Sequence, residues 1–163
     1  MILRSTEIRP DQTGHTAGRE LLKTMYQELT GKPMPPIAVT ERGKPYFKEG
    51  NLYFSVSHTS RHAFCALAEN PVGVDAEELD RNVNLKLAER ILSPREMEQF
   101  ECAENRRVAL LTFWVLKEAV AKCSGEGLRG FPNDTDFLLS DPRVITREGC
   151  LVAVIEDRRK ERV

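Results

Sequence analysis

The sequence predicts an α+β domain built from two similar halves about a pseudo-twofold, each half a helix with a small antiparallel sheet. Its 163 residues suit one compact unit. Stretches with helical and with strand periodicity come in separate groups rather than in strict alternation. Each half places a helix before strands, which divides the chain into residues 1–76 and residues 77–163, although the sequence holds no clear internal repeat.

The N-terminal half is predicted to begin with a strand over residues 1–8 and a helix over residues 16–30. The helix has apolar residues at helical spacing, and Gly31 follows it at a position that often adopts a left-handed backbone. The prolines of residues 32–36 cannot continue the helix and indicate a connector. A strand and a turn are expected next, over residues 37–40 and 42–45.

A β-meander of three strands is predicted after this turn. Its first strand, residues 51–57, alternates apolar and polar side chains as a half-buried strand does. Polar turns separate it from the second and third strands, over residues 62–68 and 72–76. The third strand ends in acids, so we expect these carboxylates near the turns of the meander.

The C-terminal half is predicted to be helical before it returns to strands. Residues 85–92 have helical spacing, and the Ser-Pro-Arg-Glu sequence at 93–96 has the form of a capping box that begins a second helix. The longest helix spans residues 106–124, and its apolar side chains cover most of its circumference, which predicts burial. Strands are expected at residues 136–139, 143–146 and 150–155, followed by a frayed charged end at 157–162.

Composition excludes several classes of function. The net charge of −1 produces no global field that would attract nucleic acid or a membrane surface. No apolar run approaches the length of a membrane span, and the first residues lack a signal-peptide pattern. The cysteines have no CxxC spacing and suit reduced thiols: Cys65, Cys102, Cys123 and Cys150. We therefore expect a cytoplasmic protein that contacts neither nucleic acid nor a membrane.

Two stretches place acids where a cation could bind. In the strand that begins at Val72, Asp75 and Glu77 are two residues apart and point to the same face. In the long helix, Glu118 and Lys122 lie one turn apart on one stripe. Carboxylate oxygens without His or Cys suit Mg²⁺ or Mn²⁺, and the lysine suits an anionic ligand. Taken alone, each motif has an ordinary alternative: a solvated turn for the strand acids and a surface ion pair for the helix.

Three further polar residues are candidates for an anion site. Lys44 lies in a Gly-Lys-Pro turn, and Ser57 and His58 close a strand where side chains and backbone N–H groups can receive an anion. The alternatives are a solvated turn lysine and a turn with a local hydroxyl hydrogen bond. His15 lies near the start of the first helix, and His62 alternates with its strand as a structural residue does.

Four motifs follow one another over residues 42–128: Gly43-Lys44-Pro45; Ser55-Val56-Ser57-His58-Thr59; Val72-Gly73-Val74-Asp75-Ala76-Glu77; and Phe113-Trp114-x-x-Lys117-Glu118-Ala119-x-x-Lys122-x-x-Gly125-x-Gly127-Leu128. In order and spacing they resemble the motifs of the 4′-phosphopantetheinyl transferases. The last two are specific to that superfamily, and the first two indicate its Sfp-type branch. In the holo-acyl-carrier-protein synthase branch the acidic motif lies near the N-terminus of a shorter chain that trimerises, whereas here a whole half precedes it. The sequence therefore resembles a compact 4′-phosphopantetheinyl transferase of the Sfp-type branch.

The resemblance implies the 4′-phosphopantetheinyl transferase fold and the reaction of that family. The expected reaction moves the 4′-phosphopantetheine arm of coenzyme A to a serine of an apo acyl or peptidyl carrier protein. It requires Mg²⁺, with Mn²⁺ as a substitute, and releases adenosine 3′,5′-bisphosphate. Because one chain carries every motif, a monomer is expected. The pathway served and the preference between coenzyme A and its acyl esters stay open.

The resemblance also assigns roles to residues of this sequence. The metal ligands would be Asp75, Glu77 and Glu118. The residues that contact coenzyme A would be Lys44, Ser57, His58, Asp75 and Lys122. Lys122 would face the α-phosphate and help the leaving group, and Glu118 would activate the serine directly or through a metal-bound water. Glu118 and Lys122 are thus the expected catalytic residues.

The sequence departs from the family pattern in two places. Ser55 stands where the family often has Asn, and the N-terminal region lacks the basic cluster that grips coenzyme A in longer relatives. Candidate substitutes for that cluster are Arg9, Arg19 and Lys23. Two other functions stay open: a Mg²⁺-dependent phosphohydrolase, because the same acids and lysine would serve water as well as serine, and a non-catalytic module that binds carrier proteins.

Overall fold

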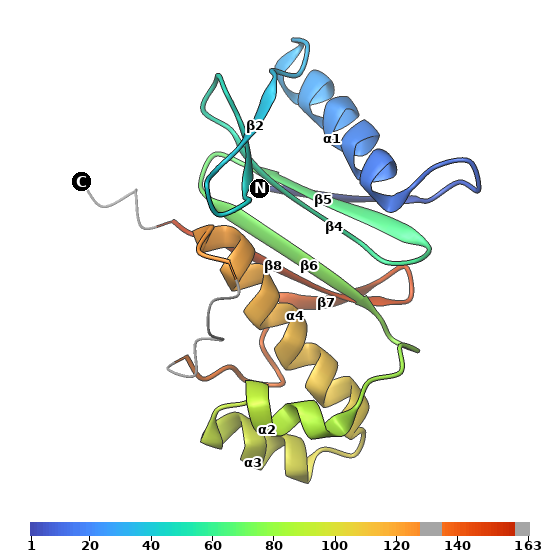
Figure 1. Cartoon of the computed structure of the whole chain (residues 1–163), viewed down its shortest axis with the longest axis vertical. Coiled ribbons are helices and arrows are strands. Elements are labelled where there is room, and N and C mark those ends of the chain that lie inside the picture. The colour runs from blue at the N-terminus through green and yellow to red at the C-terminus, as the bar shows by residue number, and fades with distance from the viewer. Residues whose placement is uncertain (128–134, 159–163) are drawn as a thin grey trace.

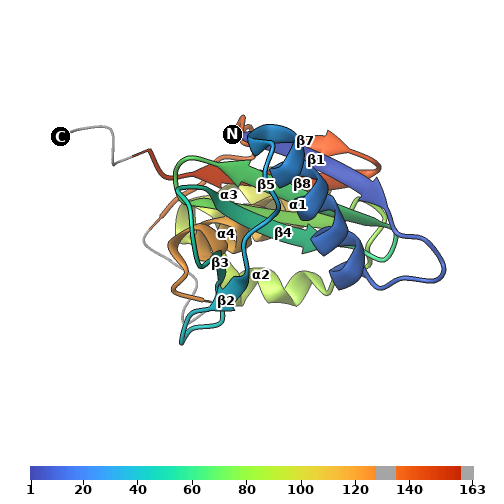
Figure 2. The same ribbon diagram turned by 90° about the horizontal axis from the view of Figure 1, so that it is seen from above.

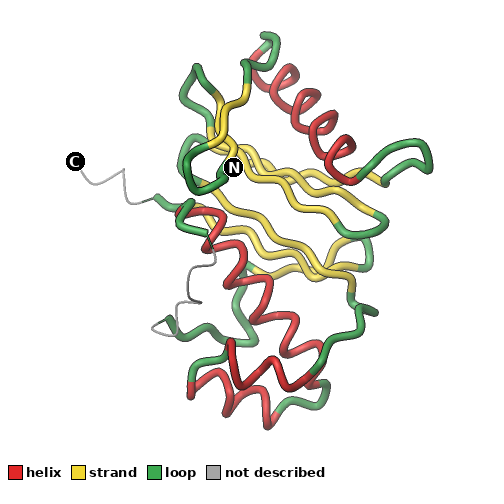
Figure 3. The backbone as a smooth tube through the Cα atoms, viewed as in Figure 1, coloured by secondary structure: helices red, strands yellow, loops and turns green. Residues whose placement is uncertain are grey.

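The computed structural model describes residues 1–127 and 135–158. In this part of the chain two three-stranded antiparallel sheets lie against each other, and one long helix covers the outer face of each sheet (Figure 1). The tube in Figure 3 shows the same order of layers: helix, sheet, sheet, helix. This mixture of helices and small antiparallel sheets confirms the predicted α+β class.

The N-terminal half folds as a strand, a helix and a hairpin. Its sheet has the order β1-β5-β4, with β1 at Ile2–Glu7, β4 at Tyr53–His58 and β5 at His62–Ala68. Helix α1 (Gly14–Thr30) begins where the Thr13 side chain accepts a hydrogen bond from the Thr16 N–H, and it ends at Gly31, whose φ of 68° favours glycine. A second small hairpin, at the lower edge of Figure 2, consists of β2 (Ile37–Val39) and β3 (Pro45–Phe47).

The C-terminal half repeats this order of elements. Its sheet has the order β6-β8-β7, with β6 at Val72–Glu78, β7 at Val144–Arg147 and β8 at Cys150–Glu156. Helix α4 (Arg106–Ser124) lies between the strand and the hairpin in sequence. In both halves the second strand of the hairpin is the middle strand of the sheet, as the prediction of two similar halves requires.

Three short helices are inserted between β6 and α4: the 3₁₀ helix η1 (Leu85–Leu87), α2 (Ala88–Ile91) and α3 (Pro94–Cys102). The predicted capping box of α3 is present, because the Ser93 hydroxyl accepts from the Glu96 N–H and the Glu96 carboxylate accepts from the Ser93 N–H.

Alternating side chains decide what lies between the layers. Phe64 of β5 and Val74 of β6 belong to the apolar cluster between the two sheets. The residues that alternate with Val74 along β6 therefore face the other way, toward α4. These residues are Gly73, Asp75 and Glu77.

Helix α4 lies directly on the backbone of β6 at Gly73. A Cβ atom at this position would lie 2.0 Å from the carbonyl oxygen of Ala119 and 2.5 Å from the backbone nitrogen of Cys123. Both atoms belong to the helix backbone, so no side-chain rotation would make room. The absence of a side chain at Gly73 thus brings the last turns of α4 against the strand that carries the acids.

The edge strands β4 and β6 meet where the two sheets join (Figure 1). Ser55 and Ser57 of β4 are both buried, and their hydroxyls accept hydrogen bonds from the N–H groups of Val74 (3.0 Å) and Ala76 (3.2 Å). Because β6 pairs with β8 on its other side, these two hydroxyls satisfy N–H groups on its outer edge. We call this junction the serine seam.

The predicted β-meander is wrong in its last strand. β4 and β5 pair as a hairpin, but β6 leaves their sheet and pairs with β8. β6 also extends two residues further than predicted, to Glu78, so that Glu77 lies within the strand together with Asp75. The boundary expected after residue 76 therefore falls inside β6, and the division between the two sheets lies before Val72.

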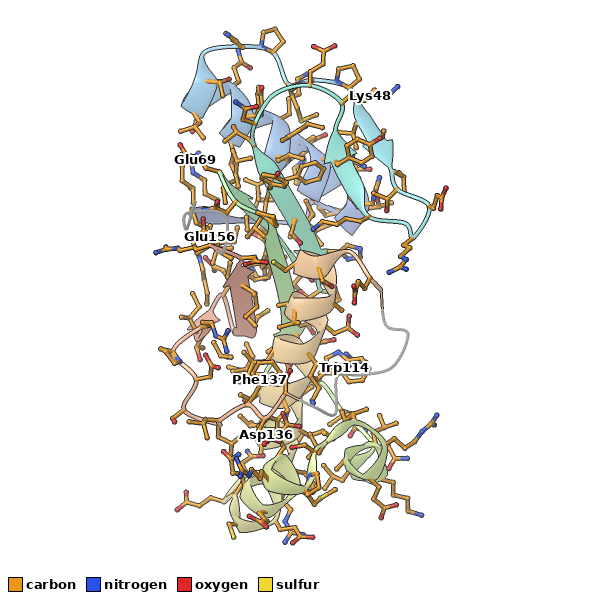
Figure 4. The ribbon with its side chains drawn as sticks, turned by 90° about the vertical axis from the view of Figure 1, so that its left-hand side faces the viewer. Lys48, Glu69, Trp114, Asp136, Phe137 and Glu156 are labelled. Carbon is orange, nitrogen blue, oxygen red and sulfur yellow. The ribbon has the colours of Figure 1, made fainter. Side chains whose placement is uncertain are left out.

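The strand predicted at residues 136–139 is also wrong, because a side chain takes the place of a neighbouring strand. The amide of Gln99 donates to the Phe137 carbonyl oxygen (3.0 Å) and accepts from the Leu139 N–H (3.0 Å). Glu96 accepts from the Phe137 N–H. Figure 4 labels Asp136 and Phe137 in this segment, beside α4. Strand β3 is an addition, since only a turn was expected there.

Two predicted features fall on positions that the structure does not describe: Leu128 of the last motif, and residues 159–162 of the charged end. None of the helices in the described residues is long and apolar enough to cross a membrane.

Candidate active site

A pocket of about 520 Å³ opens between the two halves. The C-terminal half contributes β6 and the last turns of α4, and the N-terminal half contributes α1, the β2–β3 turn and β4. Every site residue predicted from the sequence lines this pocket: Lys44, Ser57, His58, Asp75, Glu77, Glu118 and Lys122. The fold thus brings together residues that the sequence separates by up to about half of the chain.

Asp75 is the most constrained acid of the pocket. The residue is 6% exposed, and its Oδ1 accepts from the ammonium of Lys122 (2.7 Å) and from the hydroxyl of Ser57 (3.2 Å). Burial raises the pKa of Asp75, and the charge and hydrogen bond of Lys122 oppose that rise. Its other oxygen, Oδ2, is buried and has no hydrogen-bond partner among the described residues. A buried carboxylate oxygen without a donor leaves room for one further cation or donor.

Glu77 lies two residues further along the same face of β6. Its carboxylate forms an ion pair with Arg81, four residues later. Burial raises the pKa of Glu77, and the hydrogen bond and charge of Arg81 act in the opposite direction. Arg81 was not among the residues predicted from the sequence, because a single arginine in a loop gives no periodic signal.

Glu118 projects from α4 one turn before Lys122. Burial, and then the carboxylate of Asp75, raise the pKa of Glu118 to about 7, against the charge of Lys122 and with a smaller contribution from Glu77. The carboxylates of β6 and α4 therefore influence one another across the pocket. An acid with a pKa near neutrality is suited to exchange a proton at physiological pH.

The three carboxylates fit a hard divalent cation by their chemistry. All donors are oxygens, and one buried oxygen of Asp75 has no partner among the described residues. Burial, and then the like charge of Asp75, raise the pKa of Glu118, and a bound cation would oppose both effects. In residues 1–127 and 135–158, no three His, Cys, Asp or Glu side chains are grouped closely enough to hold a metal ion as they stand. Lys122 instead holds Oδ1 of Asp75, and Arg81 holds Glu77. A shared cation would therefore meet the unpartnered Oδ2 of Asp75 and exchange places with Arg81 at Glu77.

The opposite wall of the pocket is basic. Lys44 reaches across to α4, where its ammonium donates to the carbonyl oxygen of Cys123 (2.6 Å), and burial lowers the pKa of Lys44. The exposed ring of His58 lies over Gly14 at the start of α1. Three more cationic or titratable side chains line the same wall: His15, Arg19 and Arg42.

Of the basic residues proposed as substitutes for the missing cluster, Arg19 lines the pocket, whereas Arg9 and Lys23 are not among the lining residues described. Arg9 instead forms exposed ion pairs with Asp11 and Glu20. Arg42 was missed as a site residue, although its place next to the Gly-Lys-Pro turn was a signal.

Lys117, the residue before Glu118, holds α4 in place through a buried ion pair. Lys117 is fully buried, and its ammonium lies 2.9 Å from Glu96 Oε2, which is also fully buried. It also lies 5.7 Å from the centre of the Phe137 ring. Because Glu96 also caps α3 and holds Phe137, this buried ion pair ties α4 to both segments.

Fold and pocket together define an α+β protein whose carboxylates and basic side chains converge between two similar halves. Comparison with known proteins names the family: the model of the 4′-phosphopantetheinyl transferase superfamily matches residues 71–155. The chain therefore belongs to this superfamily, as its motifs predicted.

Individual relatives agree with this assignment. The chain is 31% identical over 136 residues to the 4′-phosphopantetheinyl transferase psf-1 of Bacillus pumilus, covering 80% of this chain and 58% of that protein. It is 32% identical over 123 residues to the transferase HetI of a Nostoc species, covering 69% and 52%. It is 26% identical over 118 residues to Sfp of Bacillus subtilis, covering 71% and 51%. The chain thus spans little more than half the length of these relatives. Sfp, after which the branch predicted from the motifs is named, is one of them.

Proposed function

We propose that this protein transfers the 4′-phosphopantetheine arm of coenzyme A to a serine of an apo acyl or peptidyl carrier protein. The single observation that carries the proposal is the convergence of the family motifs in one pocket, with acids on one wall and basic groups on the other. A ligand that combines a pyrophosphate with a further phosphate matches both walls.

In the proposed complex the basic wall binds the adenosine end of coenzyme A. Lys44 and His58 contact its phosphates, with Arg19 and Arg42 close by. Lys122 binds the α-phosphate, next to the bond that breaks. Asp75, Glu77 and Glu118 would hold Mg²⁺ or Mn²⁺. A bound cation would supply positive charge to offset the charges of the pyrophosphate and of the leaving group.

The proposed transfer forms one bond and breaks one. The serine oxygen bonds to the phosphorus that carries pantetheine, and the bond from that phosphorus to the bridging oxygen of the pyrophosphate breaks. The bridging oxygen keeps the electron pair and leaves with adenosine 3′,5′-bisphosphate, stabilised by Lys122. The serine proton passes to Glu118, directly or through a water. Glu118 lines the pocket one turn before Lys122, and its carboxylate can serve as the base that takes this proton.

The proposal extends to the state and location of the protein. Because both walls of the pocket come from one chain, we propose that it acts as a monomer. Its four cysteines are free thiols, which supports a cytoplasmic location.

The test is a mass measurement on the carrier protein. Incubation of apo carrier protein with coenzyme A, Mg²⁺ and this protein is expected to add the mass of the phosphopantetheine arm to the carrier serine. EDTA should abolish the reaction and Mn²⁺ restore it, and Glu118→Gln should slow it by about 100-fold or more.

Three outcomes would contradict the proposal. Phosphate released without any carrier would indicate a phosphohydrolase. Carrier binding that is indifferent to Mg²⁺ and coenzyme A, without any mass change, would indicate a binding module. Transfer at full rate in EDTA would remove the cation from the reaction.

A further inference from the structure

Each hydroxyl of the serine seam accepts a hydrogen bond from a backbone N–H of β6, but the two hydroxyls differ in one further contact. Ser55 accepts from the Val74 N–H and Ser57 accepts from the Ala76 N–H, over 3.0 and 3.2 Å. Both residues are 6% exposed. Within the described residues, only the Ser57 hydroxyl forms a second hydrogen bond, which it donates to Asp75 Oδ1 across the seam (3.2 Å).

The contact from Ser57 limits how the Asp75 carboxylate can turn. Oδ1 receives two donors that come from different halves of the molecule, Ser57 of β4 and Lys122 of α4. A carboxylate held at one oxygen by two fixed donors presents its other oxygen in one direction. That other oxygen is Oδ2, which is buried and unpartnered among the described residues.

We propose that Ser57 is a positioning residue for Asp75: its hydroxyl fixes the carboxylate so that Oδ2 is presented to the divalent cation. The inference rests on the cation site of the proposed function and adds a role for a hydroxyl of the other half. The N-terminal sheet thereby contributes to a cation site whose ligands all lie in the C-terminal half.

The same geometry argues against direct phosphate binding by the Ser57 hydroxyl. A serine hydroxyl has one proton to donate, and in this structure it is given to Asp75. To donate to a phosphate, Ser57 would have to release the carboxylate. The hydroxyl oxygen also accepts from the Ala76 N–H, so a change of the Ser57 rotamer that carried the oxygen toward a phosphate would cost a second buried hydrogen bond.

The test compares matched variants by Mn²⁺ binding, followed by electron paramagnetic resonance with and without coenzyme A and in the absence of carrier protein. Ser57→Ala removes the donor to Asp75, whereas Ser55→Ala removes a seam hydrogen bond of the same kind without touching the carboxylate. Ser57→Thr keeps the hydroxyl. Thermal unfolding of all three reports the structural cost that the seam variants share.

We expect Ser57→Ala and Ser55→Ala to lose similar amounts of stability, because each leaves one buried N–H unsatisfied. Only Ser57→Ala should weaken Mn²⁺ binding, by about 10- to 100-fold, the usual effect of losing a group that orients a metal ligand. Ser57→Thr should restore most of the affinity. If Ser57→Ala does not fold, Ser57→Cys, a weak donor of similar size, should show an intermediate loss of affinity relative to the parent.

Other outcomes would overturn the inference. Equal Mn²⁺ affinity in the parent, Ser57→Ala and Ser55→Ala would show that Ser57 does not orient Asp75. An increased KM for coenzyme A in Ser57→Ala with unchanged Mn²⁺ affinity would return Ser57 to phosphate binding. A parent protein that transfers the arm yet binds no Mn²⁺ would remove the cation site and this inference with it. A parent with intact Mn²⁺ binding and no transfer would contradict the proposed function alone.

Discussion

Replacement of Gly73 by alanine tests the contact that positions the site helix. The new Cβ would lie 2.0 Å from the carbonyl oxygen of Ala119. Carbon and carbonyl oxygen normally approach no closer than about 3.3 Å. Helix α4 would therefore have to move from β6 by more than about 1 Å at this point, since no rotamer change can relieve a clash between backbones.

The shift of α4 has consequences for stability and for the site. Overpacking of this kind costs about 1–3 kcal/mol of the free energy of unfolding. Lys122 and Asp75, which meet across the same contact at 2.7 Å, would be separated. A displacement of about 1 Å in a catalytic group typically slows a reaction by about 100-fold. Gly73→Ala should therefore lose far more transfer activity than its remaining folded fraction explains.

Gly149→Ala is the matched control. Its φ of 69° strains an alanine in the β7–β8 turn, but its Cβ would meet no atom within 4 Å. We expect a loss of stability without a loss of Mn²⁺ binding or transfer. Urea unfolding, Mn²⁺ titration and the carrier mass assay on both variants decide the matter. If Gly73→Ala keeps the stability of the parent within about 0.5 kcal/mol and keeps its activity, α4 does not approach β6 as described.

Three further variants test other contacts. Glu118 should keep its proton in the folded protein between pH 4.5 and about 7, where the unfolded chain has lost it, so stability falls as pH rises through this window. The full pKa shift corresponds to about 3 kcal/mol of the free energy of unfolding, and exposure to solvent at this half-buried group reduces that to about 1 kcal/mol. Urea unfolding at both ends of the pH window should show that the free energy of unfolding of Glu118→Gln does not fall in this way. Lys117→Met leaves the Glu96 carboxylate buried without its cation and should cost about 3–5 kcal/mol of the free energy of unfolding. The double variant Lys117→Met with Glu96→Gln should regain part of this loss. If the single and double variants lose the same stability, the two residues do not form a stabilising ion pair. Lys44→Ala should raise the KM for coenzyme A by about 10- to 100-fold, with kcat changed much less. The variant should also discriminate less than the parent between coenzyme A and dephospho-coenzyme A. An equal rise in KM for both donors would show that Lys44 does not bind the 3′-phosphate.

Local signals in the sequence predicted most elements but not the pairing of β6. Helix α1, the capping box of α3 and the long helix α4 depend on residues within a few positions of one another, so their patterns are complete in the sequence. The choice of β8 rather than β5 as the partner of β6 depends on residues far along the chain. Alternation indicates which face of a strand is buried, but it does not indicate which strand lies beside it.

The residues 136–139 illustrate a second limit. They have a composition that a short strand tolerates, but their hydrogen-bonding groups are taken by the side chain of Gln99 on α3. A side chain that substitutes for a strand leaves no periodic signal in either segment. Only the arrangement of α3 against this loop reveals it.

The acids and lysines of the site could be predicted because they lie in motifs with a fixed spacing. Their partners could not. The pairing of Glu77 with Arg81, and the bond from Lys44 to the Cys123 carbonyl, depend on how a loop and a turn are placed against the core. The sequence also could not indicate that the Ser57 hydroxyl turns toward Asp75, because β4 and β6 belong to different sheets.

The late partner of β6 has a consequence for the order in which this protein can be made. All three strands of the first sheet have left the ribosome once Ala68 has, but β6 waits for β8, which begins only at Cys150. Until then one edge of β6 is open, and an open edge is a template for pairing with another chain. During synthesis the hydroxyls of Ser55 and Ser57 can already cover the other edge. We therefore expect Ser55→Ala and Ser57→Ala to lose more yield to aggregation in the cell than the loss of stability of the purified variants explains.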